Sequence, residues 1–128
     1  MDKLKLIRNC LKEILQTYGN ARIQDGNPLD FEIIIDSERD KFLLYLTGWE
    51  GEKRIHECVL HFSVFKEKIY IQQDNTGIPI EDILCEKGIA RENIVLAYIH
   101  PDRREDSGYA KSRIASLLIQ LTKILYSF

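Results

Sequence analysis

The side chains best suited to catalysis or metal binding lie between residues 57 and 74. Cys58 and His61 have a spacing that metal ligands use. With Asp74 or Glu57, His61 could instead form a proton-transfer pair. A three-residue step along an extended strand points two side chains to opposite faces, which argues against shared ligation by Cys58 and His61. Because no nucleophile is visibly placed beside the imidazole, we favour a packed cysteine and a histidine in a polar cross-strand pair over an active site.

Two acidic motifs raise the question of a metal site elsewhere. Pro101-Asp102 matches the opening of the PD-(D/E)xK nuclease motif, but no acidic-x-Lys follows residue 102 to complete a magnesium site. The segment 36–40 places three carboxylates within five residues, as some calcium loops do. The helix-loop-helix context, the glycine and the terminal glutamate of an EF-hand are missing. We therefore reject a nuclease and expect a capped turn at 36–40 that contains Arg39.

Composition narrows the class of protein. The 128 residues fit one domain, which can bury a core without disulfides or metals. The formal net charge of −2 argues against an autonomous nucleic-acid reader, because such domains are usually strongly basic. The one basic concentration is interrupted by acidic residues. It could contact phosphate groups or an acidic partner, but we favour a solvated loop and helix start. It consists of Arg103, Arg104, Lys111 and Arg113.

Cysteine usage and the N-terminal sequence bear on the compartment. The three cysteines are odd in number and have no CxxC spacing, which indicates neither a disulfide framework nor a structural zinc site. The first residues interleave charges with leucines, so no secretory signal is expected. We predict a cytoplasmic protein without a cofactor.

Apolar periodicity predicts the elements that position these side chains. Residues 4–18 repeat apolar residues at three- and four-residue steps, as in an amphipathic helix. A connector rich in turn residues follows at 24–28. The reversal between the second and third strands is expected at Gly48–Gly51, with Trp49 on the turn. Short polar turns separate the strand-like segments, which predicts an antiparallel meander of four strands at 31–35, 42–47, 53–65 and 69–72.

The C-terminal half returns to helix. Pro79 and the acidic residues after it mark the start of a second helix, and Gly88 lies just past its end. Residues 94–99 are expected to form a fifth strand, which Pro101 ends. A last apolar-striped helix is predicted at 109–128, too short to span a bilayer.

The predicted architecture is one α+β domain over residues 1–128: helix, four-stranded meander, helix, fifth strand and C-terminal helix. Residues 109–128 are expected to be an extension of the domain. Two roles stay open for the apolar side chains of this extension, namely core packing and a subunit contact in a homo-oligomer. The side chains concerned include Leu117, Leu121 and Ile124.

Taken in order, the motifs of the chain resemble those of the XisI family, the fdxN element excision controlling factors of cyanobacteria. The resemblance covers roughly residues 1 to 101, and its joint motifs are more specific than any one alone. Beyond Pro101 the chain departs from the pattern. Members of the family usually finish soon afterwards with a short ending, to which Ser107-Gly108-Tyr109-Ala110 corresponds, and the helix predicted after it looks like an addition. The motifs are Asp36-Ser-Glu-Arg-Asp40, Gly48-Trp49-Glu-Gly51 with Arg54, Cys58-Val-Leu-His61, Lys68-Ile-Tyr-Ile-Gln72 with Asp74 and Thr76, and Ile94-Val-Leu-Ala97.

The resemblance implies a non-enzymatic accessory regulator. XisI-like proteins are named for controlling a programmed DNA excision, in which the recombinase XisF acts and XisH is a further partner. The resemblance thus implies an XisH-like partner for this chain, and it leaves open a site-specific recombinase like XisF as a second partner. The negative net charge argues against direct binding to nucleic acid, and no membrane partner is expected. An aromatic residue on a tight turn, such as Trp49, is a natural interface anchor, although Trp49 could equally plug the edge of the sheet. The candidate interaction residues are Gly48, Trp49, Gly51, Arg54, His61, Asp74, Leu117, Leu121 and Ile124.

Two other functions remain as alternatives. The chain could be an antidote-like module that restrains a nuclease-like partner. It could also be a small enzyme that uses His61 and Asp74, a hypothesis that fails if the two side chains lie on opposite faces of the sheet.

Overall fold

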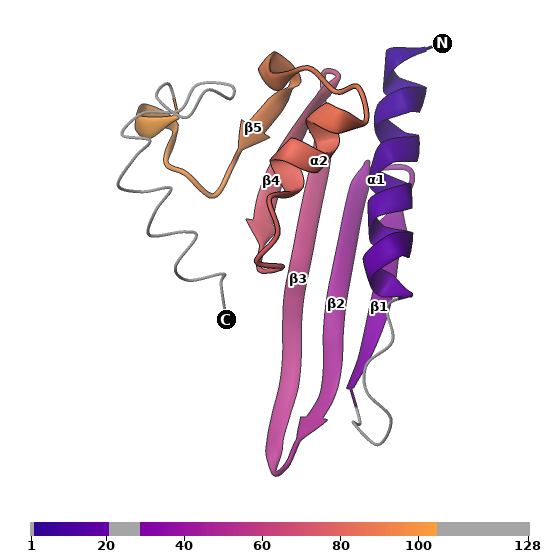
Figure 1. Cartoon of the computed structure of the whole chain (residues 1–128), viewed down its shortest axis with the longest axis vertical. Coiled ribbons are helices and arrows are strands. Elements are labelled where there is room, and N and C mark those ends of the chain that lie inside the picture. The colour runs from indigo at the N-terminus through magenta and orange to yellow at the C-terminus, as the bar shows by residue number, and fades with distance from the viewer. Residues whose placement is uncertain (1, 21–28, 105–128) are drawn as a thin grey trace.

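The computed structural model describes residues 2–20 and 29–104, which form two helices and a five-stranded sheet (Figure 1). The predicted connector at 24–28 and the predicted C-terminal helix, with Leu117, Leu121 and Ile124, lie outside the described residues. In chain order the elements are α1 (Lys3–Gly19), β1 (Leu29–Asp36), β2 (Lys41–Glu50), β3 (Lys53–Phe65), β4 (Lys68–Asp74), α2 (Ile80–Glu86), the 3-10 turn η1 (Arg91–Asn93), β5 (Ile94–Leu96) and the 3-10 turn η2 (Pro101–Arg103).

Helix α1 forms where apolar residues recur at helical spacing, as predicted. The Asp2 side chain caps its start by accepting a hydrogen bond from the Leu4 N–H at 3.3 Å. At its end, the Asn20 N–H donates to the Gln16 carbonyl at 3.0 Å. One stripe of the helix is buried, and it consists of Ile7, Cys10, Leu11, Ile14 and Leu15.

The strands lie in the order β1-β2-β3-β4-β5, and the first three pairings are antiparallel. The predicted meander is therefore confirmed. Strand β5 pairs with β4 in parallel, so α2 is the crossover of a β-α-β unit and the sheet is mixed. Strand β5 ends at Leu96, three residues earlier than predicted, because the Ile99 N–H turns back to the Leu96 carbonyl at 3.0 Å.

Both helices cover the same face of the sheet, and the hydrophobic core lies between the helices and this face (Figure 1). Cross-strand pairs such as Phe42–Phe62 and Val64–Ile69 point their side chains into this core. The predicted boundaries of α2 are confirmed: Pro79 directly precedes its first residue, and Gly88 lies just past its end with a φ of 100°. None of the helices among the described residues is long and apolar enough to cross a membrane.

The polar turn at 36–40 has the capped form that the sequence predicts. The Asp36 carboxylate accepts hydrogen bonds from the N–H groups of Glu38 and Arg39, both at 3.1 Å. The Arg39 guanidinium also donates to it at 3.0 Å, and this side-chain hydrogen bond is the main reason that the pKa of Asp36 lies below its usual value. The Asp36 carboxylate therefore caps the turn from its first residue.

Candidate functional site

The end of the β2–β3 hairpin displays an exposed aromatic side chain. Trp49 is 46% exposed and lies opposite Arg54, whose guanidinium carbon is 5.4 Å from the centre of the indole ring. Trp49 was expected on the turn, but it belongs to β2. The pairing of β2 with β3 continues to Glu50–Lys53 and leaves a reversal of two residues. Gly51, with a φ of 62°, forms that reversal at the tip.

Strand β3 contains a bulge that changes which side chains share a face. Leu44 pairs with Leu60, whereas the next residue, Tyr45, pairs with Cys58, so Val59 is an extra residue. His61 pairs with Leu43, and therefore His61 and Cys58 lie on the same face of the sheet. The expectation that they lie on opposite faces is wrong, because the bulge adds one residue to the strict alternation on which it was based.

Sharing a face does not make Cys58 and His61 reactive. The Cys58 Sγ lies 3.4 Å from the Leu60 carbonyl, and burial raises the pKa of this thiol. Burial, with a further contribution from Lys41, lowers the pKa of His61, so the imidazole is neutral at pH 7. Within residues 2–20 and 29–104, no three His, Cys, Asp or Glu side chains are grouped so that they could hold a metal ion.

Asp74 is separated from His61 by the sheet. Asp74 pairs with Leu60 and points into the helix-covered core, whereas His61 pairs with Gln73 on the other face. Asp74 is only 5% exposed and accepts hydrogen bonds from the Thr76 N–H at 3.0 Å and the Thr76 hydroxyl at 2.6 Å. Its role is to hold the connection from β4 to α2, and it cannot contribute to an exposed interaction surface.

The hypothesis of an enzyme that uses His61 and Asp74 fails on this geometry. Glu57 offers no substitute base, because it pairs with Leu46 on the face away from His61. The burial of Asp74 is the main reason that its pKa is raised, and its hydrogen bonds to Thr76 act in the opposite direction. The raised pKa of Asp74 reflects the burial of a structural carboxylate, because His61, its proposed partner, lies on the other face of the sheet.

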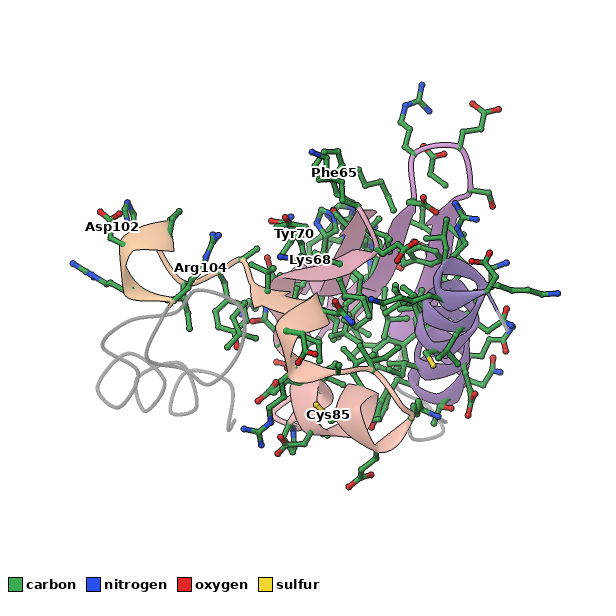
Figure 2. The ribbon with its side chains drawn as sticks, turned by 90° about the horizontal axis from the view of Figure 1, so that it is seen from above. Phe65, Lys68, Tyr70, Cys85, Asp102 and Arg104 are labelled. Atoms are coloured by element: carbon green, nitrogen blue, oxygen red, sulfur yellow. The ribbon has the colours of Figure 1, made fainter. Side chains whose placement is uncertain are left out.

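The face of the sheet opposite the helices is left uncovered by the described residues, and we call it the open face. Figure 2 shows Phe65, Lys68 and Tyr70 on the side of the sheet away from α2, on which Cys85 lies. The exposed Trp49 and Phe65, at 46% and 60%, and Ile34, at 45%, all belong to the open face by their strand register. His61 and Arg54 lie on it too, whereas Gly48 and Gly51 have no side chain to present.

One ion pair that sequence reasoning missed anchors α1 to the β1–β2 turn. Arg8 donates from Nε to Asp40 Oδ1 at 2.8 Å and from Nη2 to Asp40 Oδ2 at 2.9 Å. The hydrogen bond to Asp40 is the main reason that the pKa of Arg8 is raised. No sequence signal connects residues 32 positions apart, although the positive φ of Asp40, 52°, marks it as a special backbone position.

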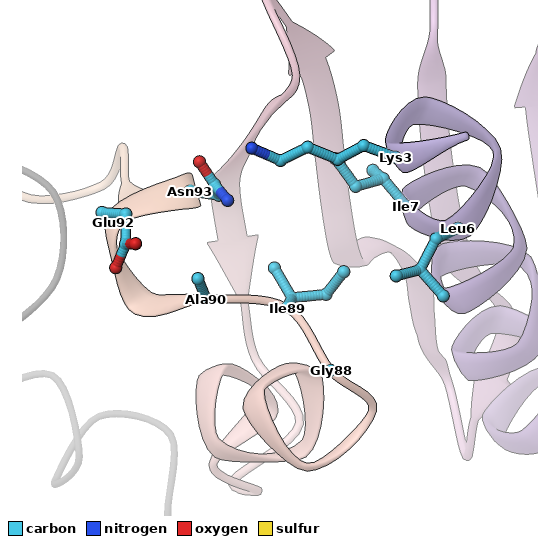
Figure 3. A pocket seen from close by; sticks show the side chains of 8 residues that line it. All are labelled: Lys3, Leu6, Ile7, Gly88, Ile89, Ala90, Glu92 and Asn93. Carbon is cyan, nitrogen blue, oxygen red and sulfur yellow. The ribbon is translucent and has the colours of Figure 1, made fainter. Parts of the chain in front are cut away.

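A pocket of about 310 Å³ lies between the first turn of α1 and the segment after α2 (Figure 3). Leu6, Ile7 and Ile89 make its apolar wall, and Lys3 and Glu92 are the charged side chains at its rim. Its size is at the lower end of ligand sites. Lys3 and Glu92 are the ionisable side chains of its lining, and both are exposed at the rim, with no histidine, cysteine or serine among the lining residues.

The basic concentration at the end of the described chain is partly structural. Arg104 donates from Nε to the Ile99 carbonyl at 2.7 Å and from Nη2 to the Ala97 carbonyl at 3.3 Å. Its guanidinium thus fastens the turn after β5. Lys111 and Arg113 lie outside the described residues.

Comparison with known proteins identifies the family. The family model described as XisI protein matches residues 1–111. A XisI-like protein from Anabaena variabilis is 30% identical, with a TM-score of 0.78 over 85% of this chain and 99% of that one. The fdxN element excision controlling factor XisI from the same organism is 31% identical, with a TM-score of 0.74 over 87% and 100% of the two chains. A search of curated proteins gave no match. The sequence match and the shared fold agree, and the chain belongs to the XisI protein family.

Proposed function

We propose that this chain is a non-enzymatic regulator of DNA excision by site-specific recombination, and that it acts by binding an XisH-like protein. The observation that carries the proposal is its likeness to an fdxN element excision controlling factor, which it matches over the whole of that chain at 31% identity. The failure of the His61–Asp74 pair supports a regulator over an enzyme. The net charge of −2 favours binding to protein over binding to DNA.

The proposed contact surface for the XisH-like protein is the exposed end of the β2–β3 hairpin. Figure 1 shows this hairpin extending beyond the ends of α1 and α2, so a partner can reach it without contacting the helices. Trp49 supplies apolar area there, and Arg54, stacked over the ring, supplies a positive charge. Tryptophan and arginine are the residues most often found to dominate binding energy. A partner surface with an apolar pocket and a neighbouring carboxylate fits this pair.

Co-expression with an XisH-like protein tests the proposal. We expect the two proteins to elute as one complex in size-exclusion chromatography. The double variant Trp49→Ala/Arg54→Ala is expected to weaken the complex at least about 100-fold, as loss of two interface anchors does. No complex with the unmodified chain would contradict the proposal.

A matched control lies at the other end of β3. Phe65 is exposed, and the Lys66 ammonium is 5.3 Å from the centre of its ring, so this pair repeats the combination of an aromatic ring and a cation. Phe65→Ala/Lys66→Ala is expected to leave the complex with the XisH-like protein intact. Equal loss in both variants would show that the hairpin end is not the specific contact.

The regulatory role needs its own measurement. Excision of a reporter element by an XisF-like recombinase is expected to require this chain together with the XisH-like protein. Excision that proceeds equally without this chain would contradict the regulatory role. Toxicity of the partner alone, relieved by this chain, would replace it with the antidote-like function.

A further inference from the structure

The open face combines an apolar centre with an uneven distribution of charge. Ile34 and Leu43 are cross-strand neighbours, and Tyr45 follows Leu43 along β2 on the same face. Four strands spaced about 4.8 Å apart and about 30 Å long give this face roughly 600 Å² in projection. Stable protein interfaces bury about 800 Å² per partner, so the face is large enough to form most of an interface.

The charges of the open face are segregated by strand. On β1 the register places Asp30, Glu32 and Asp36 on this face, with no basic side chain among them. On the other strands it places a basic residue each on β2, β3 and β4, with no acidic side chain among them. These three are Lys41, Arg54 and Lys68. One edge of the face is thus acidic, and the rest is basic.

We propose that a second copy of this chain packs against the open face, sheet against sheet, with β1 of one copy over β3 and β4 of the other. Sheets that pack face to face keep their strands nearly aligned. A two-fold axis that runs along the strands turns the acidic edge of each copy onto the basic strands of its partner. A two-fold axis across the strands would stack acidic β1 on acidic β1. Charge complementarity therefore selects the first arrangement.

The apolar centre of this dimer is separate from the proposed contact with an XisH-like protein, and the two surfaces share Arg54 at their edge. Its centre is formed by Ile34, Leu43 and Tyr45, whereas Trp49 lies at the far end of the hairpin. The apolar centre supplies the binding energy, and the acidic and basic strands set the register.

Sedimentation equilibrium of the full chain at increasing concentration tests the dimer. We expect a monomer–dimer equilibrium that weakens as salt screens the charges of the two faces. A protein that stays monomeric at all concentrations would overturn the proposal and leave the face to another occupant.

Two charge-reversal variants test the arrangement. Asp30→Lys/Glu32→Lys makes one end of β1 basic, and Arg54→Glu/His56→Glu makes the end of β3 at the same height acidic. An axis along the strands keeps each residue at its own height, so these two sets face each other in the dimer. Each variant alone places like charges against each other, so its dimer is expected to weaken by about 100-fold or more. An equimolar mixture restores complementarity at both edges, and native mass spectrometry should detect the mixed dimer.

The control variant is Glu52→Lys/Glu57→Lys. It makes the same change in net charge as the first variant, at the hairpin tip and on the helix-covered side of the sheet. It is expected to dimerise like the unmodified chain. Far-ultraviolet circular dichroism confirms that each variant folds. A mixture that does not restore the dimer, or a control that weakens it equally, would overturn the proposed arrangement.

Discussion

Arg8 holds Asp40 through two parallel hydrogen bonds, at 2.8 and 2.9 Å, and so joins α1 to the turn between β1 and β2. Asp40 ends this turn with a φ of 52°, a backbone conformation that non-glycine residues rarely adopt. The Val64 N–H also donates to the Asp40 carbonyl at 3.0 Å. One residue therefore fixes the position of the helix, the turn and β3 relative to one another.

Replacing Arg8 tests this connection. Arg8→Lys keeps the charge but loses the planar pair of N–H donors, so the midpoint of thermal unfolding is expected to fall by about 2–4 °C. Differential scanning calorimetry measures the change. Lys12→Ala, on an exposed position of α1, is the control and should leave the midpoint unchanged. An equally stable Arg8→Lys variant would show that the paired geometry contributes nothing.

The titration of Asp74 gives stability a pH dependence of unusual sign. Because burial raises its pKa, the folded state binds the Asp74 proton more tightly than the unfolded state does. The stability that this group contributes is therefore present below its ordinary pKa and is lost as the pH rises through the raised value. Asp74→Asn keeps an oxygen that can accept from Thr76 but has no proton to lose. Urea titrations should therefore show that the free energy of unfolding of Asp74→Asn, relative to that of the unmodified protein, increases from about pH 4 to pH 7.

Asp36 is the matched opposite case. Its hydrogen bonds with Arg39 lower its pKa, so its contribution is present above its ordinary pKa and is lost as the pH falls through the lowered value. Asp36→Asn should therefore lose stability relative to the unmodified protein at neutral pH and approach it in acid. The same trend for both variants would contradict the assigned roles.

The two phenylalanines near the end of β3 differ in burial. Phe62 is fully buried, whereas Phe65 is 60% exposed on the open face. Phe62→Ala should lower the free energy of unfolding by about 3–5 kcal/mol, because it removes apolar contacts and leaves a cavity. Phe65→Ala should change it by less than about 0.5 kcal/mol at concentrations where the monomer dominates. Urea unfolding of both variants checks the contrast, which would disappear if the sheet register were shifted by one residue.

Thiol labelling reports on the packing of two cysteines. Burial raises the pKa of both Cys10 and Cys58, so neither is a thiolate at neutral pH in the folded protein. Iodoacetamide should modify both about tenfold or more slowly in the folded protein than in concentrated urea. Mass spectrometry of the labelled peptides measures the rates. Rapid labelling of Cys58 in the folded state would indicate an activated thiol and reopen a chemical role for it.

Much of the fold could be predicted from local patterns in the sequence. Helical periodicity located α1, and the polar residues at 36–40 and between the strands predicted at 53–65 and 69–72 located two of the hairpins. Pro79 and Gly88 marked the ends of α2. These signals act between neighbours in the chain, where backbone sterics, capping and side-chain alternation decide the structure.

The candidate site was less accessible to the same reasoning. Strict alternation on β3 placed Cys58 and His61 on opposite faces, and the extra Val59 reversed that result. Asp74 was a surface candidate by its polarity, but its pairing with Leu60 carries it into the core. Trp49 and Arg54 were candidate interaction residues by sequence, and the structure adds that Trp49 is exposed and that Arg54 stacks on its ring.

By itself the sequence determined the order of the described elements, the antiparallel meander and the resemblance to a family, because each depends on residues close together in the chain. Only the tertiary structure decided that both helices cover one face, that β5 joins β4 in parallel, and that Arg8 reaches Asp40. These features depend on contacts between distant segments. Their free energy comes from burying shared apolar surface, and no local pattern encodes which surfaces will meet.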